Sequence, residues 1–146
     1  MLTNGLKIYF AGSIRAGRED VPIYEEIIKH LKTYGEVLTE HVGDRTLSIL
    51  GDEAPDDRFI HDRDMDFLRQ CEVVIAEVTM PSTGVGYEIA MAINMKKRVL
   101  CLYRTSAKGK LLSAMIAGCP DIMNKNYQAI NEAKSIIDDF IARQTV

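Results

Sequence analysis

A glutamate beside two glycines is the first candidate for chemistry in the sequence. Glu88 follows a loop in which Gly84 and Gly86 allow a ligand to approach the backbone closely, and Ser82 adds a hydroxyl group. We expect a helix to begin at Tyr87, so that Glu88 lies in its first turns, where the helix dipole favours the ionised carboxylate. An ionised carboxylate at this place suits a nucleophile better than a general acid. The alternative is that Glu88 only complements the dipole.

A second carboxylate, Asp64, lies on a helix predicted over residues 59–71. Asp64 shares one face of this helix with apolar side chains at Ile60, Phe67, Leu68 and Cys71. The polar face carries Asp62, Arg63, Asp66 and Arg69. A carboxyl group among apolar neighbours is either paired or has a raised pKa, and a raised pKa is what a general acid requires near neutral pH. The alternative is a buried Asp64 that caps a loop or pairs with Arg15.

Two loops contain groups that bind oxyanions. The loop over residues 12–20 holds two glycines, a hydroxyl group from Ser13 and guanidinium groups from Arg15 and Arg18, which are suitable donors for a phosphate. It has neither the Gly-Lys-Ser/Thr of a Walker loop nor the G-x-G-x-x-G of dinucleotide-binding proteins. The alternative is a solvated turn with two surface arginines. Ser82, at the start of a helix, indicates a second anion site.

Histidines occur near these groups without the spacing of metal ligands. His41 follows a predicted strand, and His61 precedes Asp64 by three residues on the same helix. Neither matches H-E-x-x-H or a comparable ligand pattern, so we expect no metal. His41 is either a structural residue or a contact to the ligand, and its place after a strand favours the second interpretation.

The residues between these groups predict alternating strands and helices. Strands are expected over residues 6–12, 36–39, 72–78 and 98–103, and helices over 59–71 and 87–95. One more helix is expected between an Asp20 cap and Gly35, another carries an apolar stripe from Ile130 to Ile141, and residues 43–55 are expected to be an irregular loop. The pattern predicts a Rossmann-like (flavodoxin-like) α/β fold, a parallel sheet with helices on both faces. Ligands of such sheets bind at the carboxyl ends of the strands.

Length and composition limit the possible classes of function. The chain has 146 residues, and we expect a single domain over residues 1–146. Eighteen basic and 21 acidic residues give a net charge of −3, which disfavours binding to nucleic acid or to an anionic membrane. No apolar run approaches the ~20 residues of a membrane span, and the first residues lack a signal-peptide pattern. Three cysteines without a C-x-x-C spacing indicate reduced thiols and a cytoplasmic location.

Five sequence blocks together resemble one known family. They are, in chain order, YFAGSIRAGRED, VLTEHV, FIHDRDMDFL, VIAEVTMPSTGVGYE and LLSAMIAG. These blocks closely resemble the 2′-deoxynucleoside 5′-monophosphate N-hydrolases of the nucleoside 2-deoxyribosyltransferase superfamily, over about residues 6–118. The resemblance implies hydrolysis of a deoxynucleotide to a free base and 2-deoxyribose 5-phosphate, with no cofactor. The departures from the family pattern are Ala16, residues 48–57 and the tail after Gly118, and none removes a catalytic group.

The resemblance also implies roles for individual residues. Glu88 would attack C1′ of the sugar, Asp64 would protonate the departing base, and Tyr9 would hydrogen-bond and orient the catalytic carboxylate. Water would then release the sugar phosphate from a covalent intermediate. The positions that match the family's binding segments are Gly12, Ser13, Ile14, Arg15, Ala16, Gly17, Arg18, Ile27, His41, Ser82, Gly84, Ser113, Ala114 and Met115. Of these, Ile27 and His41 would line the base and sugar, and residues 113–115 would enter the site of the neighbouring subunit of a homodimer.

Three other activities remain open at this point. A deoxyribosyltransferase acting on unphosphorylated nucleosides would make little use of Arg15, Arg18 and Ser113. A ribonucleotide N-glycosidase would need a polar partner for the 2′-hydroxyl, and Tyr9 stands where relatives that cleave ribonucleotides have an apolar aromatic residue. A non-catalytic nucleotide sensor would have no need for two carboxylates together.

Overall fold

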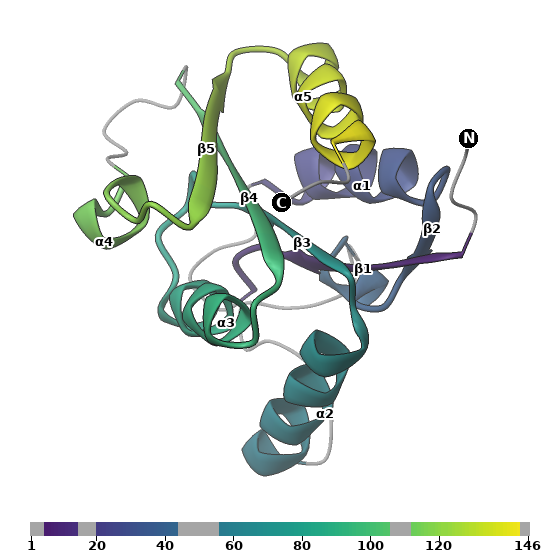
Figure 1. Cartoon of the computed structure of the whole chain (residues 1–146), viewed down its shortest axis with the longest axis vertical. Coiled ribbons are helices and arrows are strands. Elements are labelled where there is room, and N and C mark those ends of the chain that lie inside the picture. The colour runs from purple at the N-terminus through teal and green to yellow at the C-terminus, as the bar shows by residue number, and fades with distance from the viewer. Residues whose placement is uncertain (1–4, 15–19, 44–55, 106–111, 144–146) are drawn as a thin grey trace.

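A five-stranded parallel sheet runs through the computed structural model, which describes residues 5–14, 20–43, 56–105 and 112–143 (Figure 1). The strands are β1 (Leu6–Ala11), β2 (Gly35–Val37), β3 (Val73–Glu77), β4 (Arg98–Arg104) and β5 (Ile122–Tyr127). Their order across the sheet is β2-β1-β3-β4-β5, which is the flavodoxin-like order. All strands are parallel, but β2 is added on one side of β1 and β3 to β5 are added on the other, so the strand order reverses between β1 and β3. The predicted α/β fold with a parallel sheet is therefore confirmed.

Helices cover both faces of this sheet (Figure 1). On one face, α1 (Val21–Leu31) and α5 (Ile130–Ala142) pack against side chains that include Phe10 and Leu100. On the other face, α2 (Asp57–Gln70) and α3 (Thr83–Asn94) pack against side chains that include Tyr9 and Val74. Successive residues of a strand point to opposite faces, so Tyr9 lies in the layer of α2 and α3 while its neighbour Phe10 lies in the other. No helix in the described ranges is long and apolar enough to span a membrane.

Side-chain caps begin α2 and α3 earlier than the sequence pattern predicts. Asp56 accepts a hydrogen bond from Phe59 N at 2.8 Å, and Ser82 Oγ accepts one from Val85 N at 3.3 Å. Such bonds satisfy backbone donors that the first helical turn leaves open. The expectation that α3 begins at Tyr87 is wrong, because the Ser82 cap allows the two glycines of this segment to join the helix.

The aspartate expected to cap α1 has a different partner. Asp20 stands directly before the helix and its carbonyl oxygen accepts from Ile23 N and Tyr24 N, but its carboxylate makes no capping hydrogen bond. The carboxylate pairs instead with Arg104 Nη2 at 3.0 Å, at the end of β4. The expected side-chain cap is therefore wrong, because a charge-assisted bond to a guanidinium group is stronger than a bond to a neutral backbone donor.

A fully buried carboxylate connects the end of β3 with β4 and β5. Glu77 accepts hydrogen bonds from Thr79 N and Thr79 Oγ1, both at 2.8 Å, and from the hydroxyl of Tyr127. Arg104 N donates to the same threonine oxygen at 2.8 Å. Burial raises the pKa of Glu77, and its three donors act in the opposite direction. The turn that leads from β3 to α3 is thereby fixed to two neighbouring strands.

The sequence pattern predicts neither β5 nor the short helix α4 (Ala114–Ala117). β5 is an edge strand, and only its end residues, Ile122 and Tyr127, are buried. It therefore lacks the continuous apolar run by which interior parallel strands are recognised. α4 is four residues long, too short for a helical repeat. The expected irregular loop over residues 43–55 lies outside the described residues after Gly43, which ends the 3-10 helix η1 (Glu40–Gly43).

Gly35 begins β2. The expectation that this glycine terminates the preceding helix is wrong. α1 ends at Leu31, and Gly35 pairs with Leu6 of β1. A Cβ atom at position 35 would lie 1.9 Å from the carbonyl oxygen of Leu6. Close approach of two backbones therefore requires glycine here.

We expect Gly35→Ala to lower the free energy of unfolding by about 1–3 kcal/mol, the usual cost of forcing an atom into a packed region. The added methyl group has to displace the backbone of Leu6, which weakens the pairing of β1 with β2. Urea denaturation followed by circular dichroism measures the change. Gly5→Ala is the matched control, because no atom lies within 4 Å of its Cβ position. Equal unfolding midpoints for the two variants would contradict the prediction.

Candidate active site

A cavity of about 590 Å³ opens at the carboxyl ends of β1 and β3, where the strand order reverses. This is the place at which open α/β sheets bind their ligands. Its lining comes from β1, η1, α2, α3 and the turns beside them. The cavity brings together many of the residues predicted from the sequence, namely Tyr9, Gly12, Ile14, His41, Asp64, Ser82, Gly84 and Glu88.

A hydrogen bond inside this cavity joins β1 to α3. The hydroxyl of Tyr9, a residue with no exposed surface, donates to Glu88 Oε2. Burial raises the pKa of Tyr9, and the nearby carboxylates of Glu88 and Asp64 raise it further. Tyr9 therefore keeps its proton and remains a donor to the carboxylate.

Burial also decides the protonation of Glu88. Desolvation by its partial burial raises the pKa of this carboxyl group from 4.5 to about 8. The hydrogen bond from Tyr9 and the charge of Arg63 lower this pKa, whereas the negative charge of Asp64 raises it. The expectation that the helix dipole keeps Glu88 ionised is wrong, because α3 begins at Thr83 and the dipole acts mainly within the first turn.

The second carboxylate lies across the cavity on α2 and is paired. Asp64 Oδ1 accepts a hydrogen bond from Arg63 Nε at 3.0 Å, and both side chains are largely buried. A second nitrogen of the guanidinium group, Arg63 Nη2, lies 3.3 Å from His41 Nε2. Asp64 is thus paired with Arg63, whereas Arg15, the partner considered from the sequence, lies outside the described residues. Sequence reasoning missed Arg63, because the helical pattern places it on the polar face and gives no sign that its side chain turns back.

A second pair of residues at the cavity was also missed. His61 Nε2, on α2, lies 3.0 Å from the hydroxyl of Tyr87, on α3, and both side chains line the cavity while about half exposed. The two rings meet edge to face, with centroids 5.7 Å apart. The pair bridges the two helices that carry Asp64 and Glu88. No sequence signal relates residues this far apart.

Tyr24 of α1 contacts the loop after β1 and fixes its start. Ser13 N donates to the hydroxyl of Tyr24 at 3.0 Å, and a Cβ atom at Gly12 would come within 2.9 Å of the same ring. On the other side, Thr39 Oγ1 bonds both the amide and the carbonyl of Phe10, at 2.8 and 2.6 Å. The start of the loop is therefore fixed. The predicted phosphate ligands over residues 15–18, namely Arg15, Ala16, Gly17 and Arg18, lie outside the described residues.

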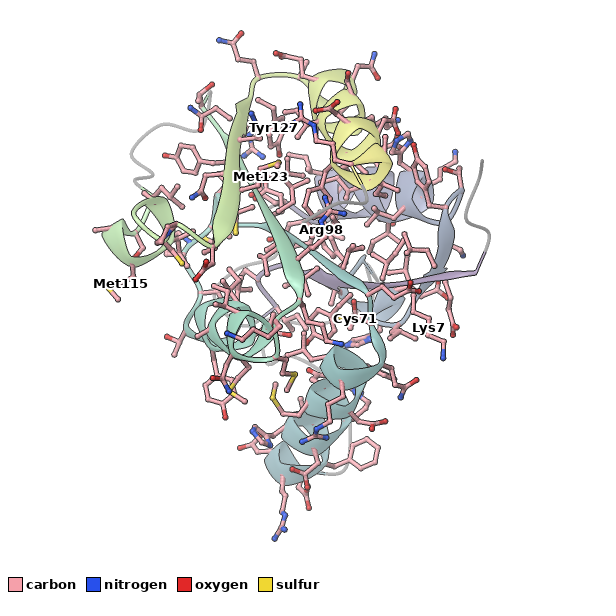
Figure 2. The ribbon with its side chains drawn as sticks, viewed as in Figure 1. Lys7, Cys71, Arg98, Met115, Met123 and Tyr127 are labelled. Carbon is pink, nitrogen blue, oxygen red and sulfur yellow. The ribbon has the colours of Figure 1, made fainter. Side chains whose placement is uncertain are left out.

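Ile27 and residues 113–115, which the sequence also predicts to bind the substrate, do not line the Glu88 cavity. Ile27 does not reach the cavity, because α1 covers the opposite face of the sheet from α2 and α3, and the residue is fully buried in the core there. A second cavity of about 800 Å³, mostly apolar, lies between α3 and α4, and Ser113 and Met115 line it. Ser113 Oγ caps α4 by accepting from Met115 N at 3.2 Å. Figure 2 shows Met115 pointing outward from α4, and Ala114 beside it is exposed.

The two cavities adjoin at the start of α3, where Ser82 lines both. Residues 113–115 thus stand near the beginning of the helix that carries Glu88 without lining the Glu88 cavity. Among the described residues, no cluster of three or more His, Cys, Asp or Glu side chains is arranged to hold a metal ion.

We expect Glu88→Gln to be more stable than the parent at pH 9, and the difference to shrink towards pH 4. Below about pH 4.5 the carboxyl group is protonated in both the folded and the unfolded chain. As the pH rises from 4.5 to about 8 the unfolded chain loses this proton first, so the parent loses stability relative to the neutral amide. Thermal unfolding over this pH range measures the difference, which should exceed about 1.4 kcal/mol, the value of one pKa unit. Exposed Glu36→Gln is the control, and a pH-independent difference for Glu88→Gln would contradict the pKa shift.

Comparison with known proteins places the chain among nucleotide-processing proteins. Residues 8–123 match the family model described as nucleoside 2-deoxyribosyltransferase. The 5-hydroxymethyl-dUMP N-hydrolase of Esox lucius is 56% identical over 140 residues, which cover 92% of this chain and 95% of that protein. The protein of the same name from Tetraodon nigroviridis is 48% identical over 143 residues, which cover 95% of this chain and 99% of that protein.

The fold has solved counterparts. A CMP N-glycosidase from Clostridium botulinum superposes with a TM-score of 0.65 at 19% identity, over 92% of this chain and 98% of the other. A designed Rossmann 2x3 protein superposes with a TM-score of 0.52 at 14% identity, over 97% and 93%. These likenesses concern the fold, whereas the family match and the relatives concern the sequence. The chain belongs to the nucleoside 2-deoxyribosyltransferase family.

Proposed function

We propose that this protein hydrolyses the N-glycosidic bond of 2′-deoxynucleoside 5′-monophosphates, releasing the base and 2-deoxyribose 5-phosphate. The observation that carries the proposal is the pair Glu88 and Asp64 at one cavity, with Tyr9 hydrogen-bonded to Glu88. Two carboxylates of different environment are what glycoside hydrolysis requires. Relatives about half identical in sequence are named N-hydrolases of a deoxynucleoside monophosphate, which favours water over a second base as the acceptor.

The reaction follows the retaining route in two steps. A Glu88 oxygen forms a bond to C1′ while the bond from C1′ to the base nitrogen breaks, and its electron pair leaves with the base. Asp64 gives the departing base a proton. Water then attacks C1′ of the glycosyl ester, Asp64 takes up a proton from that water, and Glu88 is released as a carboxylate. Splitting one displacement into two lowers the barrier of each.

The raised pKa of Glu88 sets a condition on this route. With a pKa of about 8, Glu88 holds a proton at neutral pH, whereas a nucleophile must be ionised. The reactive form therefore has Glu88 ionised and the proton on Asp64. The hydrogen bond from Tyr9 favours this form, because its hydroxyl stabilises the carboxylate and leaves the other Glu88 oxygen for the sugar.

The substrate's phosphate fits the loop side of the cavity. Ser82 and Gly84, at the start of α3, offer a hydroxyl group and backbone donors at a helix N-terminus, and Ser13 marks the start of the loop that carries Arg15 and Arg18. A sugar between these donors and Glu88 places its phosphate and its C1′ at opposite ends of the cavity. The protein is proposed to act in the cytoplasm, in keeping with free thiols at the described cysteines.

We further propose a homodimer with composite sites. Ser113 lies on an exposed segment beside a mostly apolar cavity, and the neighbouring Met115 is 82% exposed, which is unusual for a large apolar side chain in contact with water. A partner that covers this surface would bury Met115 and bring its own Ser113 to the open side of the Glu88 cavity. A closed two-fold arrangement makes both contacts twice.

The activity test compares matched substrates by chromatography of the released base. We expect dGMP, dUMP and 5-hydroxymethyl-dUMP to be cleaved faster than GMP and faster than deoxyguanosine. Glu88→Ala should abolish turnover while leaving the fold and binding of the nucleotide largely intact, and exposed Glu36→Ala should match the parent. Equal or better cleavage of GMP would favour a ribonucleotide N-glycosidase. Base exchange on unphosphorylated deoxynucleosides would favour a transferase, and release of base from neither set would favour a sensor.

The composite site predicts complementation between two inactive variants. Glu88→Ala removes the nucleophile, and Ser113→Asp places a negative charge against the substrate phosphate of the partner's site. Each variant alone should be inactive, whereas refolding an equal mixture should restore about one quarter of the parent activity, because half of the dimers are mixed and each of these has one intact site. No recovery, or a monomeric and fully active parent in light scattering, would overturn the homodimer proposal.

A further inference from the structure

Arg63 occupies an unusual position for a charged residue on the outer part of a helix. Its side chain is only 22% exposed, whereas that of Arg58, five residues earlier on α2, is 90% exposed. Adjacent residues of a helix do not face each other, so the bond between Arg63 and Asp64 requires the arginine side chain to bend along the helix. This bend brings a positive charge towards the cavity and away from water.

The guanidinium group of Arg63 contacts two site residues from two different elements. Nε donates to Asp64 Oδ1 at 3.0 Å, and Nη2 lies 3.3 Å from His41 Nε2, on η1. Its carbon also stands 5.9 Å from the centre of the Phe59 ring. A planar group with several fixed donors is suited to hold two acceptors at a set separation.

The contact with Arg63 determines which ring nitrogen of His41 carries a proton. A guanidinium nitrogen only donates hydrogen bonds, so His41 Nε2 must accept and carries no proton. The remaining ring nitrogen, Nδ1, then carries the proton of the neutral imidazole. Arg63 thereby determines which atom of His41 is a donor in a cavity that His41 lines.

We propose that Arg63 is a positioning residue, which orients the Asp64 carboxylate and sets the tautomer of His41. Arg63 itself does not line the cavity and acts through these two residues. The kinetic part of this inference rests on the proposed function, in which Asp64 protonates the base. An Asp64 carboxylate that lost this bond would rotate, and displacement of a reacting group by about 1 Å costs ~100-fold in rate.

The charge of Arg63 has a second effect, on Glu88. Among the described residues, the groups that shift the pKa of the Glu88 carboxylate are Tyr9 from β1 and Asp64 and Arg63 from α2. Arg63 lowers the pKa of Glu88, so its removal raises that pKa further above 8. The reactive form holds a single proton, on Asp64, and the pair loses that last proton above the pKa of about 8. The alkaline limb of the pH profile of kcat/KM therefore moves to higher pH when Arg63 is lost.

Three variants of the full chain test the inference. Arg63→Met keeps much of the side chain's length and removes its donors, Arg63→Lys keeps the charge without the planar fork, and Arg69→Met, an exposed arginine farther along α2, is the matched control. We expect Arg63→Met to lower kcat/KM for dGMP by about 10- to 100-fold, mainly through kcat, with an unfolding midpoint close to that of the parent. Arg63→Lys should recover part of the loss and keep the alkaline limb of the pH profile in place. Arg69→Met should match the parent.

A measurement without substrate separates this inference from the proposed function. Nitrogen-15 NMR of His41 should show the Nδ1-protonated tautomer in the parent and in Arg69→Met, and a mixture of tautomers in Arg63→Met. If the parent cleaves no nucleotide, the proposed function fails while the tautomer result still decides the role of Arg63 towards His41. Parent-like kinetics, pH profile and His41 tautomer in Arg63→Met would overturn the inference.

Discussion

The Glu88 carboxylate is partly buried between a strand and two helices, and this burial costs free energy that other groups must offset. Tyr9 supplies a hydrogen bond from β1, the strand at which the sheet reverses its order, and Arg63 supplies a positive charge from α2. The offset is partial, so the carboxyl group keeps a pKa of about 8. A group that exchanges its proton near neutral pH, held against a second carboxylate, is suited to a reaction that needs one proton at the right atom.

The cavity depends on where three elements begin and end. β1 aims Tyr9 into the layer of α2 and α3, because the residues beside it on the strand face the other layer. The Ser82 cap starts α3 early enough to place Glu88 in its second turn, within reach of Tyr9. The Asp56 cap starts α2 so that Asp64 falls on the side of the cavity. Two short polar side chains at helix starts thus help to place the two carboxylates at one cavity.

Much of this arrangement follows from local sequence patterns, and the remainder depends on contacts between distant residues. The parallel sheet, the four longer helices, and the place of Glu88 and Asp64 at a strand-end cavity could be predicted, because apolar periodicity and turn residues are local signals. The strand β5 could not, since an edge strand with two buried residues has no apolar run. The bend of Arg63 and the His61–Tyr87 contact depend on tertiary structure, and Ile27 shows that a core residue and a ligand contact look alike in sequence.

The buried Glu77 has a consequence for the order in which the molecule is completed during synthesis. Its carboxylate takes one of its three donors from Tyr127, fifty residues later in the chain. A ribosome delivers the N-terminal part of the chain first, and a buried acceptor that lacks a donor is costly. The turn between β3 and α3 therefore reaches its final bonding only after β5 has emerged and docked at the edge of the sheet. A nascent chain that already contains Tyr9, Asp64 and Glu88 still lacks the last support of the helix that carries Glu88.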